Sequence, residues 1–104
     1  MYYNQKGEKI GAKEFSELMA VRENKIVKQE FTKNKLWVST VFLGLNYRYG
    51  EGAPIIYETM VFPSEDNLSD LDCRRYCTKE EALQGHKELF EEWKDHAFIP
   101  EVVD

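Results

Sequence analysis

One stretch in the middle of the chain, residues 37–62, limits the possible folds more than any other part of the sequence. It contains two apolar runs, WVSTVFLGLN and IIYETMVF, joined by the segment YRYGEGAP. Both runs are rich in β-branched and aromatic residues, which suit the pleated surface of a sheet. The pattern therefore predicts a β-hairpin with a long connecting loop. The Gly and Tyr residues of this loop suit contact with another molecule, and the alternative is an ordinary mobile hairpin tip.

Both faces of the expected hairpin strands are apolar. In the first run Trp37 and Val41 point to one side, while Val38 and Phe42 point to the other. Strands of this kind are either central and covered on both sides, or covered on one side and docked to a partner. The sequence leaves both arrangements open.

Glu58 is the one carboxylate within these two strands. If the strands pair symmetrically about Gly50, Glu58 lies opposite Phe42, on the same face as Met60. A carboxylate in that position needs a partner or an open edge, because burying it alone is costly. We consider a salt bridge to an arginine the simpler interpretation and a functional carboxylate the alternative. The candidate partners are Arg48, Arg74 and Arg75.

The segments on either side of the hairpin predict further strands and one short helix. The apolar stripe Phe15, Leu18 and Met19 has helical spacing, so we expect a helix over residues 12–23 that packs this stripe into the core. Residues 26–32 alternate weakly and carry charges that suit an edge strand. Residues 72–77 predict a short fourth strand.

The clearest local signal is the sequence Thr78-Lys79-Glu80-Glu81, a capping box that should begin a helix. We expect this helix to run to about Asp95. Gly85 within it suggests the close approach of another backbone. The residues expected on its buried side are Ala82, Leu83, His86, Leu89, Phe90 and Trp93.

Together these elements predict an α+β fold, with an antiparallel β-meander of three to four strands packed against two helices. We expect one domain over residues 1–100, with a C-terminal tail at 101–104. No apolar run approaches the ~20 residues of a membrane span, and the N-terminus lacks the apolar segment of a signal peptide. A cytoplasmic setting is therefore expected, where the two cysteines would stay reduced.

The charged residues are distributed unevenly along the chain. Residues 1–52 carry nine Lys or Arg against six acids, a balance of +3, whereas residues 53–104 carry five against thirteen, a balance of −8. Direct binding of nucleic acid by the second half is disfavoured, because phosphate neutralisation needs clustered Lys and Arg. An acidic surface could instead engage a basic protein surface. The alternative is an acidic face that only contacts water.

Candidate chemical sites in the sequence are few. His86 on the apolar side of its helix is typical of a hydrogen-bonded core histidine; the alternative is a catalytic pair with Glu58, the one strand carboxylate expected near it. A zinc site built from Cys73, Cys77 and His86 lacks the spacing of known fingers and a fourth ligand. We therefore predict neither a metal site nor a cofactor.

Two groups of short motifs occur together in the chain. The first is VSTVFLGLN at 38–46 with YG at 49–50 and ETMVF at 58–62; the second is YxT at 76–78, EA at 81–82 and GH at 85–86. Over roughly residues 37–62 and 72–90 the combination resembles a family of small, uncharacterised proteins of tailed bacteriophages and prophages. In that family a histidine often follows the Leu-Gly-Leu-Asp/Asn run, where this chain has Tyr47. The resemblance implies a phage origin and the host cytoplasm, and it implies no particular activity.

These observations favour a phage-encoded acidic interaction protein that binds and inhibits a host protein, with a nucleic-acid-binding defence nuclease as one candidate target, as for anti-CRISPR proteins. It would contact neither nucleic acid nor membrane directly. The alternatives are a self-associating accessory phage protein, such as a homodimer, and a small enzyme or metal-binding protein that uses Glu58 and His86. The expected contact residues are Tyr47, Arg48, Tyr49, Glu65, Asp66, Asp70, Asp72, Glu80, Glu88, Glu91 and Glu92.

Overall fold

The structure of the chain, a computed structural model, describes residues 1–98. Its centre is a four-stranded antiparallel sheet in the order β3 (Ile26–Phe31), β4 (Trp37–Phe42), β5 (Tyr57–Phe62) and β6 (Asp72–Tyr76). Each strand pairs with the next one along the chain, so the sheet is the expected meander and the α+β fold class is confirmed. The expected domain end at residue 100 and the tail at 101–104 lie outside the described residues.

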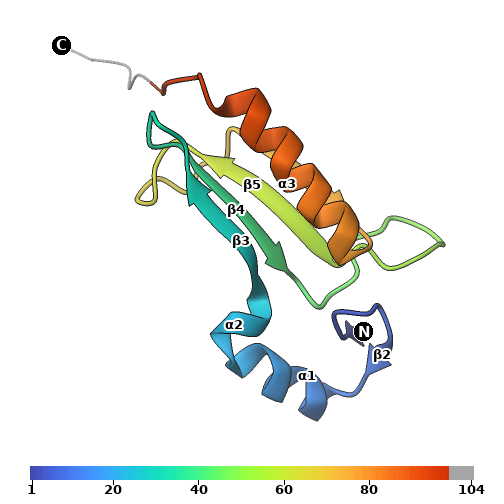
Figure 1. Cartoon of the computed structure of the whole chain (residues 1–104). Coiled ribbons are helices and arrows are strands. Elements are labelled where there is room, and N and C mark those ends of the chain that lie inside the picture. Colours follow the sequence, from blue (N-terminus) through green and yellow to red (C-terminus); the bar gives the residue numbers. More distant parts are fainter. Residues whose placement is uncertain (99–104) are drawn as a thin grey trace.

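A single long helix, α3 (Lys79–Trp93), lies along one face of the sheet and contacts all four strands (Figure 1). It begins with the expected capping box: the Thr78 hydroxyl accepts from the Glu81 N–H at 3.1 Å, and the Glu81 carboxylate accepts from the Thr78 N–H at 3.0 Å. Its buried residues include Ala82, His86 and Leu89. Leu83, which we expected to be buried, is 43% exposed.

Gly85 lets α3 approach the sheet closely, although not through the backbone contact that we expected. A Cβ atom at this position would overlap the hydroxyl and ring of Tyr76, which reaches up from β6. The close neighbour is therefore the aromatic side chain of Tyr76, which packs directly against the backbone of α3 at its one glycine, Gly85.

The register of the central hairpin differs by one residue from the symmetric pairing about Gly50. Phe42 lies opposite Tyr57, and Glu58 lies opposite Val41. The rings of Phe42 and Tyr57 meet at 5.4 Å between centroids, and both are buried beneath α3. Because a slip of one residue turns each side chain to the other face, this register keeps Glu58 off the face that the helix covers.

The N-terminal segment forms a smaller unit beyond one end of the sheet (Figure 1). A two-stranded ladder, β1 (Tyr2–Tyr3) and β2 (Lys9–Ile10), precedes α1 (Ala12–Ala20) and the short α2 (Arg22–Lys25). The expected helix over residues 12–23 is therefore interrupted at Val21. No residue of α1 is buried, so its apolar stripe contributes to the core less than we expected, with Leu18 and Met19 only partly buried against it.

The core between α3 and the sheet has two apolar clusters. One lies towards the N-terminal unit and the other towards the opposite end of α3, where Leu89 packs with Trp93 at its margin. The buried members of the first are Tyr3, Phe42, Ile56, Tyr57, Tyr76 and Ala82; those of the second are Leu36, Val38, Val61 and Leu89. No helix within residues 1–98 is long and apolar enough to cross a membrane.

Candidate protein-binding surface

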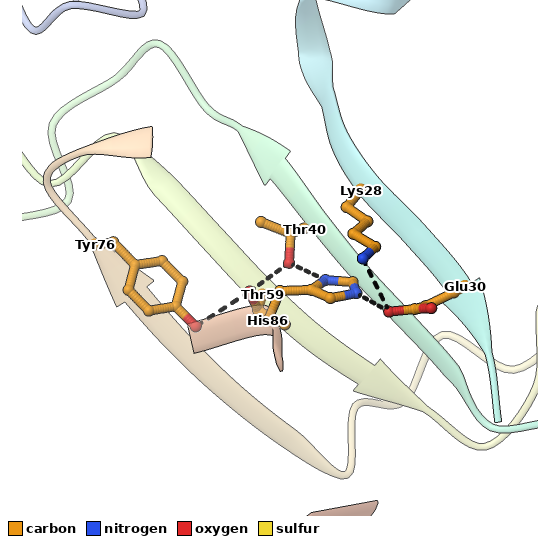
Figure 2. Close-up of polar contacts among 6 residues, drawn as sticks. All are labelled: Lys28, Glu30, Thr40, Thr59, Tyr76 and His86. Carbon is orange, nitrogen blue, oxygen red and sulfur yellow. Dashed lines mark hydrogen bonds and ion pairs between the residues drawn. The ribbon is translucent and has the colours of Figure 1, made fainter. Parts of the chain in front are cut away.

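His86 belongs to a chain of hydrogen-bonded polar groups between α3 and the sheet, all buried except the partly exposed Glu30 at one end (Figure 2). Its Nδ1 lies 2.6 Å from the Thr40 hydroxyl on β4, and its Nε2 lies 2.7 Å from the Glu30 carboxylate on β3. The Thr40 hydroxyl is 2.5 Å from that of Thr59 on β5, which accepts from the Tyr76 hydroxyl at 3.1 Å. Each of the four strands thus contributes one side chain to this series of hydrogen bonds.

The direction of these hydrogen bonds follows from the charge state of His86. Burial is the main influence and lowers the pKa of His86, against the opposing effect of Glu30, so the ring is neutral at pH 7. A carboxylate can only accept, so Nε2 carries the proton and donates to Glu30, and Nδ1 accepts from Thr40. Thr59 then donates to Thr40, and Tyr76 donates to Thr59. Every side chain in this series of hydrogen bonds therefore has a hydrogen-bond partner.

The order Thr40, His86, Glu30 matches the nucleophile, base and orienting carboxylate of a hydrolase. However, Thr40 is 0% exposed and His86 1% exposed, so no substrate can reach the hydroxyl in this conformation. The contact with Glu30 confirms the interpretation of His86 as a hydrogen-bonded core histidine. We assign the chain of groups a structural role, in which it fills the space between the two apolar clusters.

The hypothesis of a Glu58–His86 catalytic pair is wrong, because the two side chains lie on opposite faces of the sheet. Glu58 pairs with Arg75 on β6, with 3.2 Å between Oε2 and Nε. The Arg75 guanidinium also lies 5.0 Å from the centre of the Tyr47 ring, a cation–π contact. One of the three expected arginine partners of Glu58 is thus confirmed, and the pair marks one end of the uncovered face of the sheet.

We call this uncovered face the open sheet face. Within residues 1–98, α3 is the one helix that contacts all four strands, and α2 reaches only β3 and β4. A row of aromatic rings crosses the open sheet face: Trp37 stacks with Phe31 at 6.2 Å and packs against Phe62 at 5.5 Å. The strand residues of this face, assigned from the sheet register, are Gln29, Phe31, Trp37, Ser39, Val41, Glu58, Met60, Phe62, Cys73 and Arg75.

The middle of the open sheet face is hollowed into a shallow groove of about 290 Å³. Its walls are largely apolar, and Leu68, which is 67% exposed, borders it from the loop at 63–71. Beyond Phe31 a second hollow of about 450 Å³ is lined by Lys35, Glu65 and Asp66. An apolar centre with a charged margin is the usual anatomy of a protein interface.

The contact residues expected from the sequence do not form one patch. Tyr47, Arg48 and Tyr49 lie in the loop between β4 and β5, at one end of the sheet. Glu65, Asp66 and Asp70 lie in the loop between β5 and β6, at the opposite end. The predicted contact acids of α3 lie on its exposed side, across the sheet from the open sheet face; they are Glu80, Glu88, Glu91 and Glu92.

Several of these side chains are engaged within the molecule. Asp72 accepts from the indole N–H of Trp93 at 3.0 Å, which ties β6 to the end of α3. Glu88 pairs with Arg74 at 2.8 Å, and the hydrogen bond from Gln84, followed by the contact with Arg74, lowers the pKa of Glu88. Glu91 pairs with Lys94 at 2.8 Å. Pairs this exposed are worth little, and a partner's charge can replace them.

The hairpin loop divides into a fixed part and a fully exposed tip. The Arg48 guanidinium donates to the Ala53 carbonyl at 2.7 Å and to the Cys77 sulfur at 3.5 Å, so it braces the loop. Tyr49 at the tip is fully exposed. Of the three residues predicted as an anchor, Tyr49 is therefore the one most accessible to another molecule.

The aromatic row of the open sheet face was not among the residues expected to make contacts. Its signal was present in the sequence as apolar residues on both faces of the hairpin strands, but the pattern cannot tell which face a helix covers. Cys73 lies on this face and His86 on the other, so the proposed zinc ligands do not converge. Nowhere in the described part of the chain do three or more His, Cys, Asp or Glu side chains group to hold a metal ion.

Comparison of the chain with protein-family models, with curated proteins and with solved structures found no match in any of the three.

Proposed function

We propose that this chain is a phage-encoded interaction protein that acts in the host cytoplasm by binding, and so inhibiting, a host protein with a basic surface. The observation that supports the proposal most directly is the run of acids along the exposed side of α3. Glu80, Glu88, Glu91 and Glu92 are all exposed on one rigid helix whose inner side is anchored in the core.

The rigidity of α3 suits this role. The capping box fixes its first turn, and buried Ala82, His86 and Leu89 fix its inner side. Acidic side chains on a preorganised helix lose less conformational freedom on binding than acids on a mobile loop. They also raise the rate of encounter with a basic partner, and this effect falls as salt is added.

The candidate target class follows from the same chemistry. A surface that binds nucleic acid is rich in Lys and Arg. A helix whose acidic side chains match the spacing of those basic side chains can therefore occupy the surface. The resemblance of residues 37–62 and 72–90 to small phage proteins supports a host target, such as a defence nuclease that binds nucleic acid. Tyr49 at the exposed loop tip would add an aromatic contact, a residue type favoured at interface hot spots.

The test starts from affinity capture of host proteins on the purified chain at low and moderate salt, followed by binding measurements with the partner found. The double variant Glu80→Lys and Glu92→Lys reverses two charges for which the structure shows no ion pair within residues 1–98. We expect at least about a tenfold loss of affinity and a weaker salt dependence. Glu17→Lys, an exposed acid on α1, is the matched control and should bind like the wild type.

Two results would count against the proposal. A wild-type chain that retains no host protein at either salt concentration would leave the inhibitor function without a target. A partner whose affinity and salt dependence are the same for the double variant and for the wild type would show that the acidic side of α3 is not the contact surface.

A further inference from the structure

We propose that the open sheet face is the interface of a homodimer, in which two copies of this chain pack sheet against sheet. This inference is independent of the host target, because the acidic side of α3 points away from the open sheet face. It assigns a function to the one large apolar surface that no helix or strand of residues 1–98 covers.

The composition of the open sheet face is that of an interface core. Trp37, Val41, Met60 and Phe62 are each partly exposed, and Phe31 is 49% exposed. A contiguous apolar patch of a few hundred Å² is often a functional surface even on a monomer. Aromatic residues, Met and Arg are also the types enriched at protein interfaces. A second sheet packed on this face would remove the patch from water.

The charge distribution favours a second copy as the occupant. The chain has a net charge of −5, so two copies repel each other across most of their surface. On the open sheet face the charges balance, because the Glu58 carboxylate is already bonded to the Arg75 guanidinium. Two copies can therefore meet through the strand residues of this face without bringing like charges together, while Glu65 and Asp66 stay at its margin beside Lys35. The exposed side of α3, by contrast, would repel a second copy.

The size of the face fits a weak dimer. Four strands about 4.8 Å apart and about six residues long, at about 3.3 Å per residue, cover roughly 400 Å² per copy. Side-chain relief and the flanking residues Leu68 and Tyr47 add to this area, which brings it to about the 500 Å² per partner that a specific interface needs. A dissociation constant in the micromolar range is the reasonable expectation for such an interface.

The resulting assembly would have four layers: helix, sheet, sheet and helix. Two sheets packed face to face lie about 10 Å apart, and a two-fold axis would place the same patch on both sides of the interface. The α3 helices would form the two outer layers. Each dimer would thus carry its acidic helix surfaces outwards, where both remain available to other molecules.

Sedimentation equilibrium of the purified chain over a range of concentrations tests the proposal. We expect a reversible monomer–dimer equilibrium in the wild type. Met60→Glu places two like charges in the middle of the dimer interface, and Phe31→Glu places them at the exposed end of the aromatic row. Each should weaken dimerisation by at least about tenfold. Leu83→Glu makes the same kind of change on the exposed side of α3 and should dimerise like the wild type.

A wild-type chain that sediments as a monomer at every concentration would overturn the proposal and leave the face to a different partner. A dimer that persists in folded Phe31→Glu and folded Met60→Glu would also overturn it, because the copies would then meet elsewhere. Circular dichroism verifies the fold of each variant. If Met60→Glu does not fold, Phe31→Glu decides the outcome, because its side chain is already half in water.

Discussion

His86 shows how a single buried side chain can tie an α+β fold together. It joins α3 to β3 through Glu30 and to β4 through Thr40, and these contacts connect residues 56 and 46 positions apart in the sequence. The hydrogen bond from Thr40 to Nδ1 depends on the neutral form of the ring, whereas the bond from Nε2 to Glu30 does not. Protonation at Nδ1 would turn an acceptor into a donor, and the Thr40 hydroxyl could then no longer donate to it.

This dependence predicts a stability that falls in mild acid. Burial lowers the pKa of His86 from 6.5, so below about pH 6.5 the unfolded chain binds more protons than the folded one. The free energy of unfolding should therefore fall as pH drops from 6.5 to the folded pKa, by at most about 1.4 kcal/mol per pH unit from this group. Urea titrations at pH 7 and pH 5 measure the slope. His86→Gln should be less stable at pH 7 and should show a smaller slope; an equal slope in both proteins would contradict the prediction.

Gly85 carries a second prediction at the scale of one residue. Gly85→Ala should destabilise the fold by about 1–3 kcal/mol through overpacking against Tyr76, although alanine favours a helix by about 1 kcal/mol. Lys87→Ala, at an exposed position of the same helix, should be nearly neutral. In a Tyr76→Ala background the penalty at Gly85 should disappear. Chemical denaturation of the four proteins in the Gly85–Tyr76 cycle gives the coupling directly; additive effects would show that the two residues do not collide.

At the scale of elements, the structure follows the sequence most closely where the signals are local. The capping residues Thr78 and Glu81 are three positions apart, and the helix begins where they predict. The hairpin strands were also predictable, since their β-branched and aromatic residues occur in continuous runs. The register was not, because it depends on Phe42 and Tyr57 being buried together under a helix that comes later in the chain.

The first helical segment shows where a local sequence signal is not sufficient to predict packing. An apolar stripe with helical spacing predicted a core helix, but α1 lies beyond the end of the sheet, where Phe15 stacks on Tyr2 at 4.3 Å. Periodicity shows which side of a helix is apolar, yet it does not show how much surface is available to bury that side. The interruption at Val21 likewise depends on where β3 must start.

The capping box gives a prediction for α3 as a whole. Thr78→Ala removes the hydroxyl that accepts from the Glu81 N–H, so the first turn of α3 loses one of its few satisfied donors. We expect a loss of about 1 kcal/mol in the free energy of unfolding, measured by urea denaturation. Thr78→Ser keeps the hydroxyl and should stay within a few tenths of a kcal/mol of the wild type. Equal losses in the two variants would show that the methyl group matters and the cap does not.

At the scale of the whole molecule, the two sides of the sheet have different characters. One side is covered by α3, whose outer surface is acidic; the other is apolar and open. The molecule is elongated, with overall dimensions of 51 × 24 × 24 Å. Its radius of gyration of 15.3 Å exceeds the roughly 13 Å typical of 100 residues, because the N-terminal unit extends beyond the sheet. The sequence showed that acids are concentrated in residues 53–104, but only the fold places the acids of α3 on a different side from the aromatic row.

A dimer formed through the open sheet face would make thermal stability depend on protein concentration. Unfolding would then be coupled to dissociation, so a higher concentration favours the folded dimer by mass action. We expect the Tm of the wild type and of Leu83→Glu to rise with concentration in differential scanning calorimetry. Phe31→Glu, once circular dichroism has verified its fold, places like charges across the interface and should have a Tm that changes less with concentration. A wild-type Tm that is independent of concentration would mean that the aromatic row stays in water in the folded protein, and the stability of the chain would then come from the α3 side of the sheet alone.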